Sequence, residues 1–286
     1  MYEASIENAS GNVYILTGDE PVYQVVDIRG LNPPSAQLNT TNIVGLDGAL
    51  YNSARLNTRE LVLTVKINGD VEKNRLNLYR HFVTKEWCRF SYKNESLDVF
   101  IEGYVENVEC DLFTNAETAQ ISILCPDPYF KSQEEFSVDA SSVSELFTFP
   151  FTIEYDDPVV ISELEVSRVT NVYNDTATES GVFIDIEVDA NVSDIQIRNT
   201  ETGEQIELQY AFHAGDRIQI NTYKGQKKVL LTRAGATTNI FPAVQMGSVF
   251  FQLHPGDNLF AYQVDAGTQN QSVFIVFRHR SLYRGV

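Results

Sequence analysis

Basic residues, cysteines and long apolar runs are all scarce in this sequence, and each scarcity argues against a class of protein. The chain has 21 Lys and Arg against 39 Asp and Glu, a formal net charge of −18. Affinity for nucleic acid comes largely from basic side chains on phosphates, so this charge argues against a nucleic-acid-binding protein. For the same reason we expect no docking on an anionic membrane.

Cysteine is represented only by Cys88, Cys110 and Cys125, with no CxxC pair among them. That spacing excludes the common zinc and thioredoxin-like patterns, and an odd number argues against a disulfide framework. We therefore expect buried, reduced thiols of a protein made in the cytoplasm. The first ten residues have neither the basic nor the apolar region of a signal peptide, so none is expected. The longest strongly apolar runs, such as Val273–Phe277, have the length of a strand and are too short to span a bilayer.

Aromatic residues are abundant, with 14 Tyr and 17 Phe, and this favours strands over helices. In the first half, apolar residues alternate with polar ones, as in Leu61, Leu63, Val65 and Ile67, which predicts half-buried strands. Trp87, the only tryptophan, lies in such a strand, and we expect it in the core. The predicted strands of this half are Tyr14–Leu16, Val22–Arg29, Leu61–Ile67, Glu86–Tyr92, Leu97–Val105 and Ala119–Cys125.

A helix is predicted over residues 70–84, where the alternation stops. Asp70 can cap its amino end. The apolar residues then follow at helical spacing, and we expect their stripe to cover one face of the sheets. They are Leu76, Tyr79, Phe82 and Val83.

Prolines 126 and 128 end the first half, and a polar, Ser-rich stretch follows at Lys131–Ser144. We therefore predict a first domain at 1–133, a linker or connecting strand at 134–155 and a second domain at 156–286. Short strands separated by Gly-containing turns indicate an antiparallel β-sandwich in the second domain. Its predicted strands lie at 182–188, 195–197, 206–208, 218–220, 229–231, 249–253, 259–264 and 273–277. The predicted fold class is thus mainly β.

No catalytic motif with specific spacing is present. The four histidines, at 81, 213, 254 and 279, share no metal-ligand spacing, and no nucleophile elbow or phosphate-binding loop is found. The many carboxylates are expected to form a solvated acidic surface. We predict no catalytic residue, no metal ligand and no cofactor.

Several segments, in this order and spacing, resemble the distal tail protein family of long-tailed siphophages. In the second half they are Gly215–Ile220, Pro255–Asn258 and Tyr283–Val286. In the first half they are Tyr23–Ala36, Leu46–Arg55, Arg59–Glu60, Gly69–Phe82, Gly103–Val105 and Cys125–Phe130.

The resemblance implies an N-terminal β-sandwich-like domain with one helix and a C-terminal galectin-like β-sandwich. It further implies a homo-hexameric ring at the tail tip, a structural hub rather than an enzyme, through which DNA passes without specific binding. Implied partners are other copies of the chain, the tail tube protein, the tail-tip protein and a receptor-binding protein. The implied location is the virion, with assembly in the bacterial cytoplasm. Two alternatives stay open: a lectin-like adhesion module that recognises host saccharide, and an enzyme that acts on cell-wall polymers.

A closed ring needs two different matching patches on each subunit. We expect one patch in the segment 30–59, which the prolines and Gly48 suggest is an extended loop rather than a core strand. An ordinary surface loop is the alternative. The candidate interface or motif residues are Pro33, Pro34, Asp47, Gly48, Arg55 and Arg59.

Overall fold

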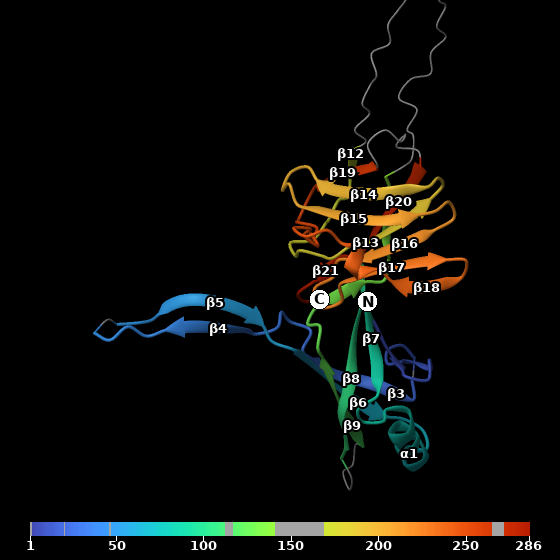
Figure 1. The fold of residues 1–286 in the computed structure, drawn as a ribbon. Coiled ribbons are helices and arrows are strands. Elements are labelled where there is room, and N and C mark those ends of the chain that lie inside the picture. Colours follow the sequence, from blue (N-terminus) through green and yellow to red (C-terminus); the bar gives the residue numbers. More distant parts are fainter. Residues whose placement is uncertain (1, 20, 46, 112–116, 141–168, 265–271) are drawn as a thin grey trace, which may run out of the picture. The chain divides into compact units, whose positions relative to one another are not determined.

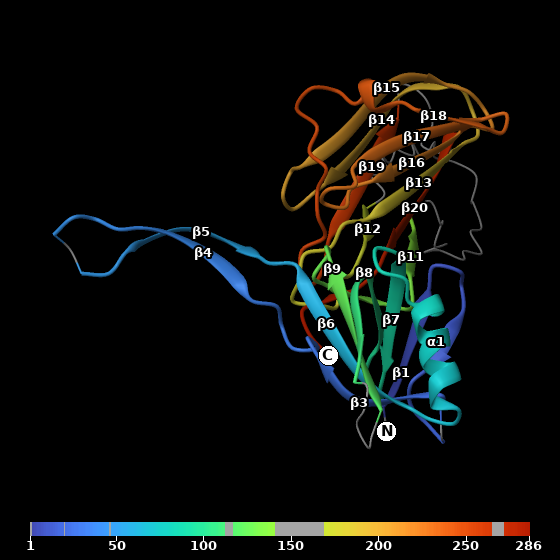
Figure 2. The ribbon, with the colours of Figure 1, turned by 90° about the horizontal axis from the view of Figure 1, so that it is seen from below.

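A computed structural model of the chain describes residues 2–19, 21–45, 47–111, 117–140, 169–264 and 272–286. It divides into two compact units, and the second is inserted into the first. The first consists of Met1–Glu134 and Leu282–Val286, and the second of Glu135–Ser281. Nearly all regular structure is β-strand, and the described residues contain a single α-helix (Figures 1 and 2). The predicted mainly-β fold is confirmed.

The first unit is built on one antiparallel sheet of nine strands. Alternation along its central strands places one side in the core, as Leu61, Leu63 and Val65 of β6 show. β10 (Phe130–Ser132) pairs with β8 and with β21 (Leu282–Tyr283), so the chain returns to this unit after the second one. The other strands follow the order β2 (Val13–Ile15), β1 (Glu3–Asn8), β7 (Trp87–Lys93), β8 (Asp98–Cys110), β9 (Thr118–Cys125), β6 (Arg59–Ile67) and β3 (Tyr23–Arg29).

Helix α1 (Val71–His81) lies inside the predicted range 70–84, and its start was predicted correctly. The Asp70 carboxylate accepts a hydrogen bond from the Lys73 amide at 3.3 Å.

The predicted apolar stripe is largely wrong: of its four residues only Phe82 is buried, and Leu76, Tyr79 and Val83 are exposed. The buried helical residue is Leu78, which was not predicted. Leu78 and Phe82, the residue at which the helical conformation ends, both belong to the core of the first unit.

Trp87 is half-buried, so the prediction that it lies in the core is wrong. Its strand neighbours Cys88 and Phe90 point into the core instead. Since successive side chains of a strand point to opposite faces, Trp87 lies on the outer face of the sheet. The strand was predicted correctly, but the side of the sheet that Trp87 faces was not. Trp87, Cys88 and Phe90 are all apolar, so the sequence does not show which of them point into the core.

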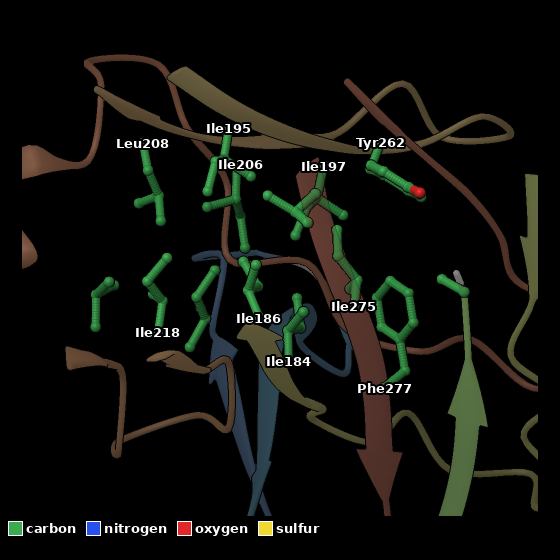
Figure 3. Packing of buried hydrophobic residues seen from close by; sticks show 14 of the residues in the cluster. Ile184, Ile186, Ile195, Ile197, Ile206, Leu208, Ile218, Tyr262, Ile275 and Phe277 are labelled. Atoms are coloured by element: carbon green, nitrogen blue, oxygen red, sulfur yellow. The ribbon is translucent and has the colours of Figure 1, made fainter. Parts of the chain in front are cut away.

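The second unit is the predicted antiparallel β-sandwich. Isoleucines from both sheets meet between the layers, among them Ile184, Ile186, Ile195 and Ile197 (Figure 3). Each fully buried side chain of this size contributes roughly 1.5–3 kcal/mol. One sheet has the order β11 (Phe136–Asp139), β20 (Val273–His279), β13 (Phe183–Val188), β16 (Arg217–Asn221), β17 (Lys228–Arg233) and β18 (Ala236–Asn239). The other has the order β12 (Val169–Asn171), β19 (Leu259–Val264), β14 (Val192–Asn199) and β15 (Gln205–Phe212).

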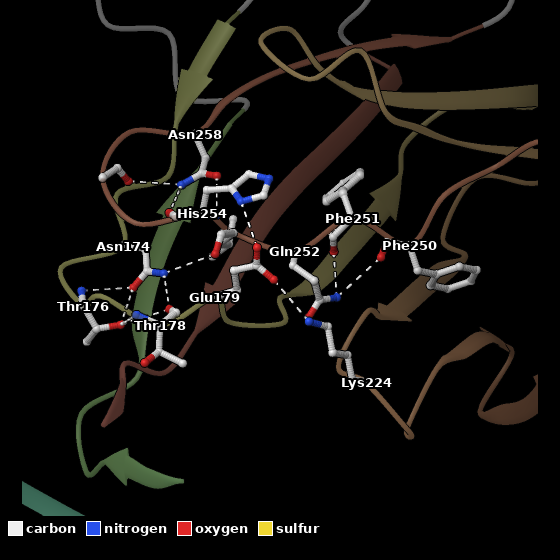
Figure 4. A network of polar contacts seen from close by, with 12 residues as sticks. Asn174, Thr176, Thr178, Glu179, Lys224, Phe250, Phe251, Gln252, His254 and Asn258 are labelled. Carbon is white, nitrogen blue, oxygen red and sulfur yellow. Dashed lines mark hydrogen bonds and ion pairs between the residues drawn. The ribbon is translucent and has the colours of Figure 1, made fainter. Parts of the chain in front are cut away.

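The strand predicted at 249–253 is absent. Phe250 and Phe251 are consecutive and both buried, which a strand with one buried face does not allow. The Gln252 side chain donates to the backbone carbonyl of Thr222 at 2.7 Å. It also donates to the carbonyl of Phe251 at 3.1 Å (Figure 4). A short 3-10 turn, η1 (Phe241–Ala243), precedes this irregular segment.

Most of the predicted linker, residues 141–155, lies outside the described residues.

Two buried asparagines hold the irregular connections of the second unit (Figure 4). Asn174 donates to the carbonyls of Thr178 and Leu253 and accepts from the amide and hydroxyl of Thr176. Asn258 accepts from the His254 amide at 2.8 Å and donates to the His254 carbonyl at 2.8 Å. A buried side-chain amide is costly unless its hydrogen bonds are made, so these networks fix the loops around them.

His279 on β20 is a buried titratable group, 1% exposed. Its ring stacks on Phe136 with centroids 5.4 Å apart. Burial lowers the pKa of His279, against a smaller opposing effect of Asp175 and the Tyr173 backbone. The folded state therefore favours neutral imidazole.

We expect acidification to destabilise the second unit through His279. Because the folded pKa is lowered, the unfolded chain binds more protons once the pH falls through about 6.5, and stability is lost progressively until the folded pKa is reached. Thermal unfolding followed by circular dichroism should show a flatter pH dependence for His279→Gln than for the wild type. His213→Gln, at an exposed histidine, is the control and should keep the wild-type slope. Equal slopes for all three proteins would contradict the assignment.

Candidate functional site

The segment between β3 and β6 forms an exposed β-hairpin, which we call the arm (residues 36–56). Its strands β4 (Ala36–Thr41) and β5 (Leu50–Leu56) pair with each other and, within the described part of the chain, with no other strand. All of β4 and all of β5 except Leu56 are exposed. Both views show the arm reaching away from the nine-stranded sheet (Figures 1 and 2). The extended loop expected for this segment is therefore an ordered hairpin outside the core.

One face of the arm is polar and is held by side-chain hydrogen bonds across the two strands. Arg55 donates from Nε and Nη2 to Gln37 Oε1 at 2.9 and 2.7 Å. Asn39 donates to Ser53 Oγ at 2.9 Å, and beyond an irregularity in the register Asn52 donates to Thr41 Oγ1 at 2.7 Å. Sequence reasoning missed this hairpin because polar residues predominate in its strands and their apolar alternation is short.

The opposite face of the arm is largely apolar. Because side chains alternate, the residues between the polar ones lie together on it: Ala36, Leu38, Thr40, Tyr51, Ala54 and Leu56. Leu38 is 62% exposed and Tyr51 is 65% exposed, so nothing in the described structure covers them. An isolated two-stranded ribbon is at best marginally stable in water, and exposed apolar surface is typical of an interaction site. The arm thus has a face suited to a partner.

The arm is anchored by Arg59, the first residue of β6. This side chain is 3% exposed, and its guanidinium donates only to backbone carbonyls. Burial lowers the pKa of Arg59, but an arginine of such high ordinary pKa stays charged. Its acceptors are the carbonyls of Pro128 at 2.8 Å, Asn32 at 2.7 Å, Arg284 at 2.5 Å and Gly30.

Arg59 therefore joins three chain segments that are distant in the sequence. Gly30 and Asn32 begin the connection to the arm, Pro128 follows β9, and Arg284 belongs to the last residues. The guanidinium also lies 4.6 Å from the centroid of the Phe130 ring, a cation–π contact. A planar guanidinium with five donors can serve acceptors in several directions, which a lysine ammonium cannot do with this geometry.

Two glycines allow the backbone to close around this anchor. Gly30 has φ +92°, and a Cβ there would lie 2.1 Å from the Glu60 carbonyl oxygen. A Cβ on Gly285 would lie 2.9 Å from Pro33 Cδ, and the Val286 amide donates to the Leu31 carbonyl at 3.1 Å. The final residues thus pack directly against the root of the arm.

The structure separates the candidate residues into three places. Pro33 and Pro34 lie at the root of the arm near the Arg59 anchor, and Arg55 lies on its polar face. Asp47 and Gly48 are exposed in the turn between the two arm strands. The candidate residues did not include Leu38 and Tyr51, the large exposed side chains of the apolar face. The alternation of Leu38 with Gln37 and Asn39 was a signal that could have identified them.

No group of three potential metal ligands from His, Cys, Asp and Glu occurs within residues that the structure describes. None of the described helical segments is both long and apolar enough to cross a membrane. The exposed apolar face of the arm makes the arm and its anchor the main functional candidate.

Comparison with protein families covers both units. Residues 14–125 match the phage tail protein RIFT-related domain, and residues 175–280 match the siphovirus-type tail component, C-terminal domain. The chain belongs to the siphophage distal tail protein family. The resemblance predicted from the sequence is thus confirmed, and the chain is a structural component of a phage tail and of the virion. No curated protein matches it.

Solved structures share the fold of this distal tail protein at low sequence identity. The Dit protein of phage SPP1, described as a paradigm of the hub adsorption apparatus in phages that infect Gram-positive bacteria, is 15% identical with a TM-score of 0.68. That match covers 97% of this chain and 98% of the other. Chains of the phage P2 baseplate in its activated conformation, with Ca or with Sr, are 12% identical with a TM-score of 0.57, and coverage is 100% of both chains.

Removal of the Arg59 guanidinium should strongly destabilise the first unit. Arg59→Ala leaves several buried carbonyls without a donor, each costing about 1–3 kcal/mol, so we expect a total loss of about 3–5 kcal/mol. Arg59→Lys should recover only part of this loss, because one ammonium cannot reach all the acceptors. Urea unfolding would measure the free energies. Arg55→Ala, at the exposed arginine on the arm, should change stability by less than about 0.5 kcal/mol. Similar losses for Arg55→Ala and Arg59→Ala would rule out the anchor.

Proposed function

We propose that this distal tail protein forms a homo-hexameric ring, the hub that joins the tail tube to the adsorption apparatus and leaves a channel for DNA. The observation that carries the proposal is the arm: an ordered, rigidly anchored hairpin whose apolar face has no cover within the chain. Such a face is suited to a contact between subunits.

The charge of the arm supports a contact between like copies. The whole chain carries a net charge of −18, so two copies repel each other at long range. Residues 36–56 contain one acidic residue, Asp47, and one basic residue, Arg55, so the arm has no net charge. An uncharged, partly apolar element can dock on an acidic neighbour without adding to this repulsion.

We further propose a non-enzymatic role with protein partners. The matched families are phage tail domains, and the similar solved structures come from a tail hub and a baseplate. The proposed partners are the tail tube protein, the tail-tip protein and a receptor-binding protein, with assembly in the bacterial cytoplasm. DNA passes through the ring without specific binding, because an acidic protein repels phosphates rather than holding them.

Light scattering on a sizing column tests the ring directly. One chain has a mass of 32.2 kDa, so a closed cyclic hexamer would have a mass of roughly 190 kDa. A monomeric mass at all concentrations up to those of crystallisation would contradict self-assembly of the purified chain.

Changes on the apolar face of the arm should separate the subunits. We expect the double variant Leu38→Ser with Tyr51→Ser to shift the hexamer toward monomer, because loss of buried apolar contacts weakens association at least about tenfold. Removal of residues 39–48 should have the same effect. The control is Asn39→Ser on the polar face, which should keep the mass of the wild type. If the apolar-face variants kept a mass near 190 kDa, the arm would not be the contact between subunits.

A further inference from the structure

The turn that joins the two strands of the arm contains the only Asp-Gly pair of the sequence, Asp47 and Gly48. Both residues are exposed. Gly48 has φ +86°, and a Cβ built on it would meet no atom beyond its chain neighbours within 4 Å, so the backbone there has open space around it. Within the described residues, no hydrogen bond or ion pair holds the Asp47 side chain. This pair therefore has room to change conformation, as loop tips generally do.

An aspartate followed by glycine can react with its own backbone. The Gly48 amide nitrogen attacks the carboxyl carbon of Asp47, a C–N bond forms, and the amide proton leaves with the carboxyl hydroxyl as water. The product is a five-membered succinimide ring. Water then adds to one of the two ring carbonyls, which restores aspartate or gives isoaspartate, in which the backbone runs through the former side chain. Glycine favours ring closure, because it has no Cβ to crowd the attacking nitrogen.

A pair of higher intrinsic reactivity is held fixed by the structure. Asn68 and Gly69 form the only Asn-Gly pair of the sequence, and asparagine undergoes the same ring closure with loss of ammonia. However, Asn68 Nδ2 donates to the Pro21 carbonyl at 2.9 Å. The Asn68 backbone amide donates to the Val22 carbonyl at 2.9 Å, and its carbonyl accepts from Asn74 Nδ2 at 2.7 Å. Ring closure requires the side chain and the backbone of Asn68 to rotate, and these hydrogen bonds oppose that rotation.

We propose that Asp47 is a modification site, at which the folded protein converts spontaneously to isoaspartate, while Asn68 keeps its amide. The fold thus reverses the order of reactivity that the two dipeptides have in a flexible chain. The inference does not rest on the proposed ring, because the turn lies beyond the strands whose apolar face we assign to the contact between subunits.

Isoaspartate changes the arm without changing its mass or its net charge. The backbone between positions 47 and 48 gains one carbon atom, so the connection between β4 and β5 becomes longer. Asp47 is the only acidic residue of the arm, and its carboxylate moves onto the Cα atom. The hydrogen bond from Asn52 to Thr41 Oγ1, at 2.7 Å, lies at the turn end of the two strands and is the first that the longer connection would disturb.

Storage of the full chain tests the proposal. The protein is kept at physiological temperature in mildly acidic buffer, where more carboxyl groups are in the uncharged form that reacts. Isoaspartate is then quantified with an isoaspartyl methyltransferase and labelled S-adenosylmethionine, and is located by electron-transfer fragmentation of the peptides. Asp47→Glu is the matched control, because it keeps the charge but can close only a less favourable six-membered ring. A second control is the wild type stored in guanidinium chloride, which unfolds the chain and removes the hydrogen bonds of Asn68.

In the folded wild type, the label should accumulate in the peptide that contains positions 47 and 48. In Asp47→Glu it should stay at the level of a fresh sample. The Asn68 peptide should keep its amide in the folded chain, but in guanidinium chloride it should deamidate faster than Asp47 isomerises. If the folded wild type gains no more label than Asp47→Glu, Asp47 is not a modification site. If Asn68 deamidates as fast in the folded chain as in the denaturant, its hydrogen bonds do not protect it and the proposed reversal is wrong.

Discussion

The burial of one positive charge organises the first unit. A guanidinium removed from water is costly unless its donors are satisfied, and Arg59 meets that requirement with backbone carbonyls alone. Those carbonyls belong to the root of the arm, to the chain after β9 and to the final residues. The hydrogen bonds that one buried side chain requires thus hold together three backbone segments that belong to different parts of the sequence. The Phe130 ring packs against the guanidinium of Arg59 in a cation–π contact.

This anchor makes the exposed two-stranded arm better suited to bind a partner. A ribbon with free edges gains little stability by itself, and a flexible one would lose conformational freedom on binding. Because Arg59 fixes the root, part of this loss of conformational entropy has already occurred before a partner binds. Hydrogen bonds between the two strands on the polar face, such as those from Arg55 to Gln37, restrict the conformation of the arm beyond its root. The apolar face is then presented in a defined orientation.

Much of the framework could be predicted from the sequence, because it depends on local periodicity. The alternation in β6, the cap at Asp70 and the sandwich of the second half all follow from neighbouring residues. The errors concern information that is not local. Trp87 alternates as a core residue would, but only the sheet decides which face is covered. The segment 249–253 is apolar enough for a strand, but it forms an irregular connection in which the Gln252 side chain donates to the Thr222 carbonyl and to carbonyls of its own segment. Of the candidate site, Arg59 and the prolines were identified as a motif. The hydrogen bond from Arg59 to the Arg284 carbonyl could not be predicted, because the two residues are 225 positions apart in the sequence.

The return of the chain to its first unit has a consequence for biosynthesis. Residues 282–286 supply β21 and the Arg284 carbonyl, but the ribosome makes them only after the whole second unit. Since domains generally fold as units during synthesis from the amino end, the sandwich can fold while the first unit still lacks its last strand and one acceptor of its buried charge. Until then the root of the arm is incompletely fixed. The anchor of the arm is therefore complete only after translation has passed the inserted unit, although the arm itself is among the first segments to be made.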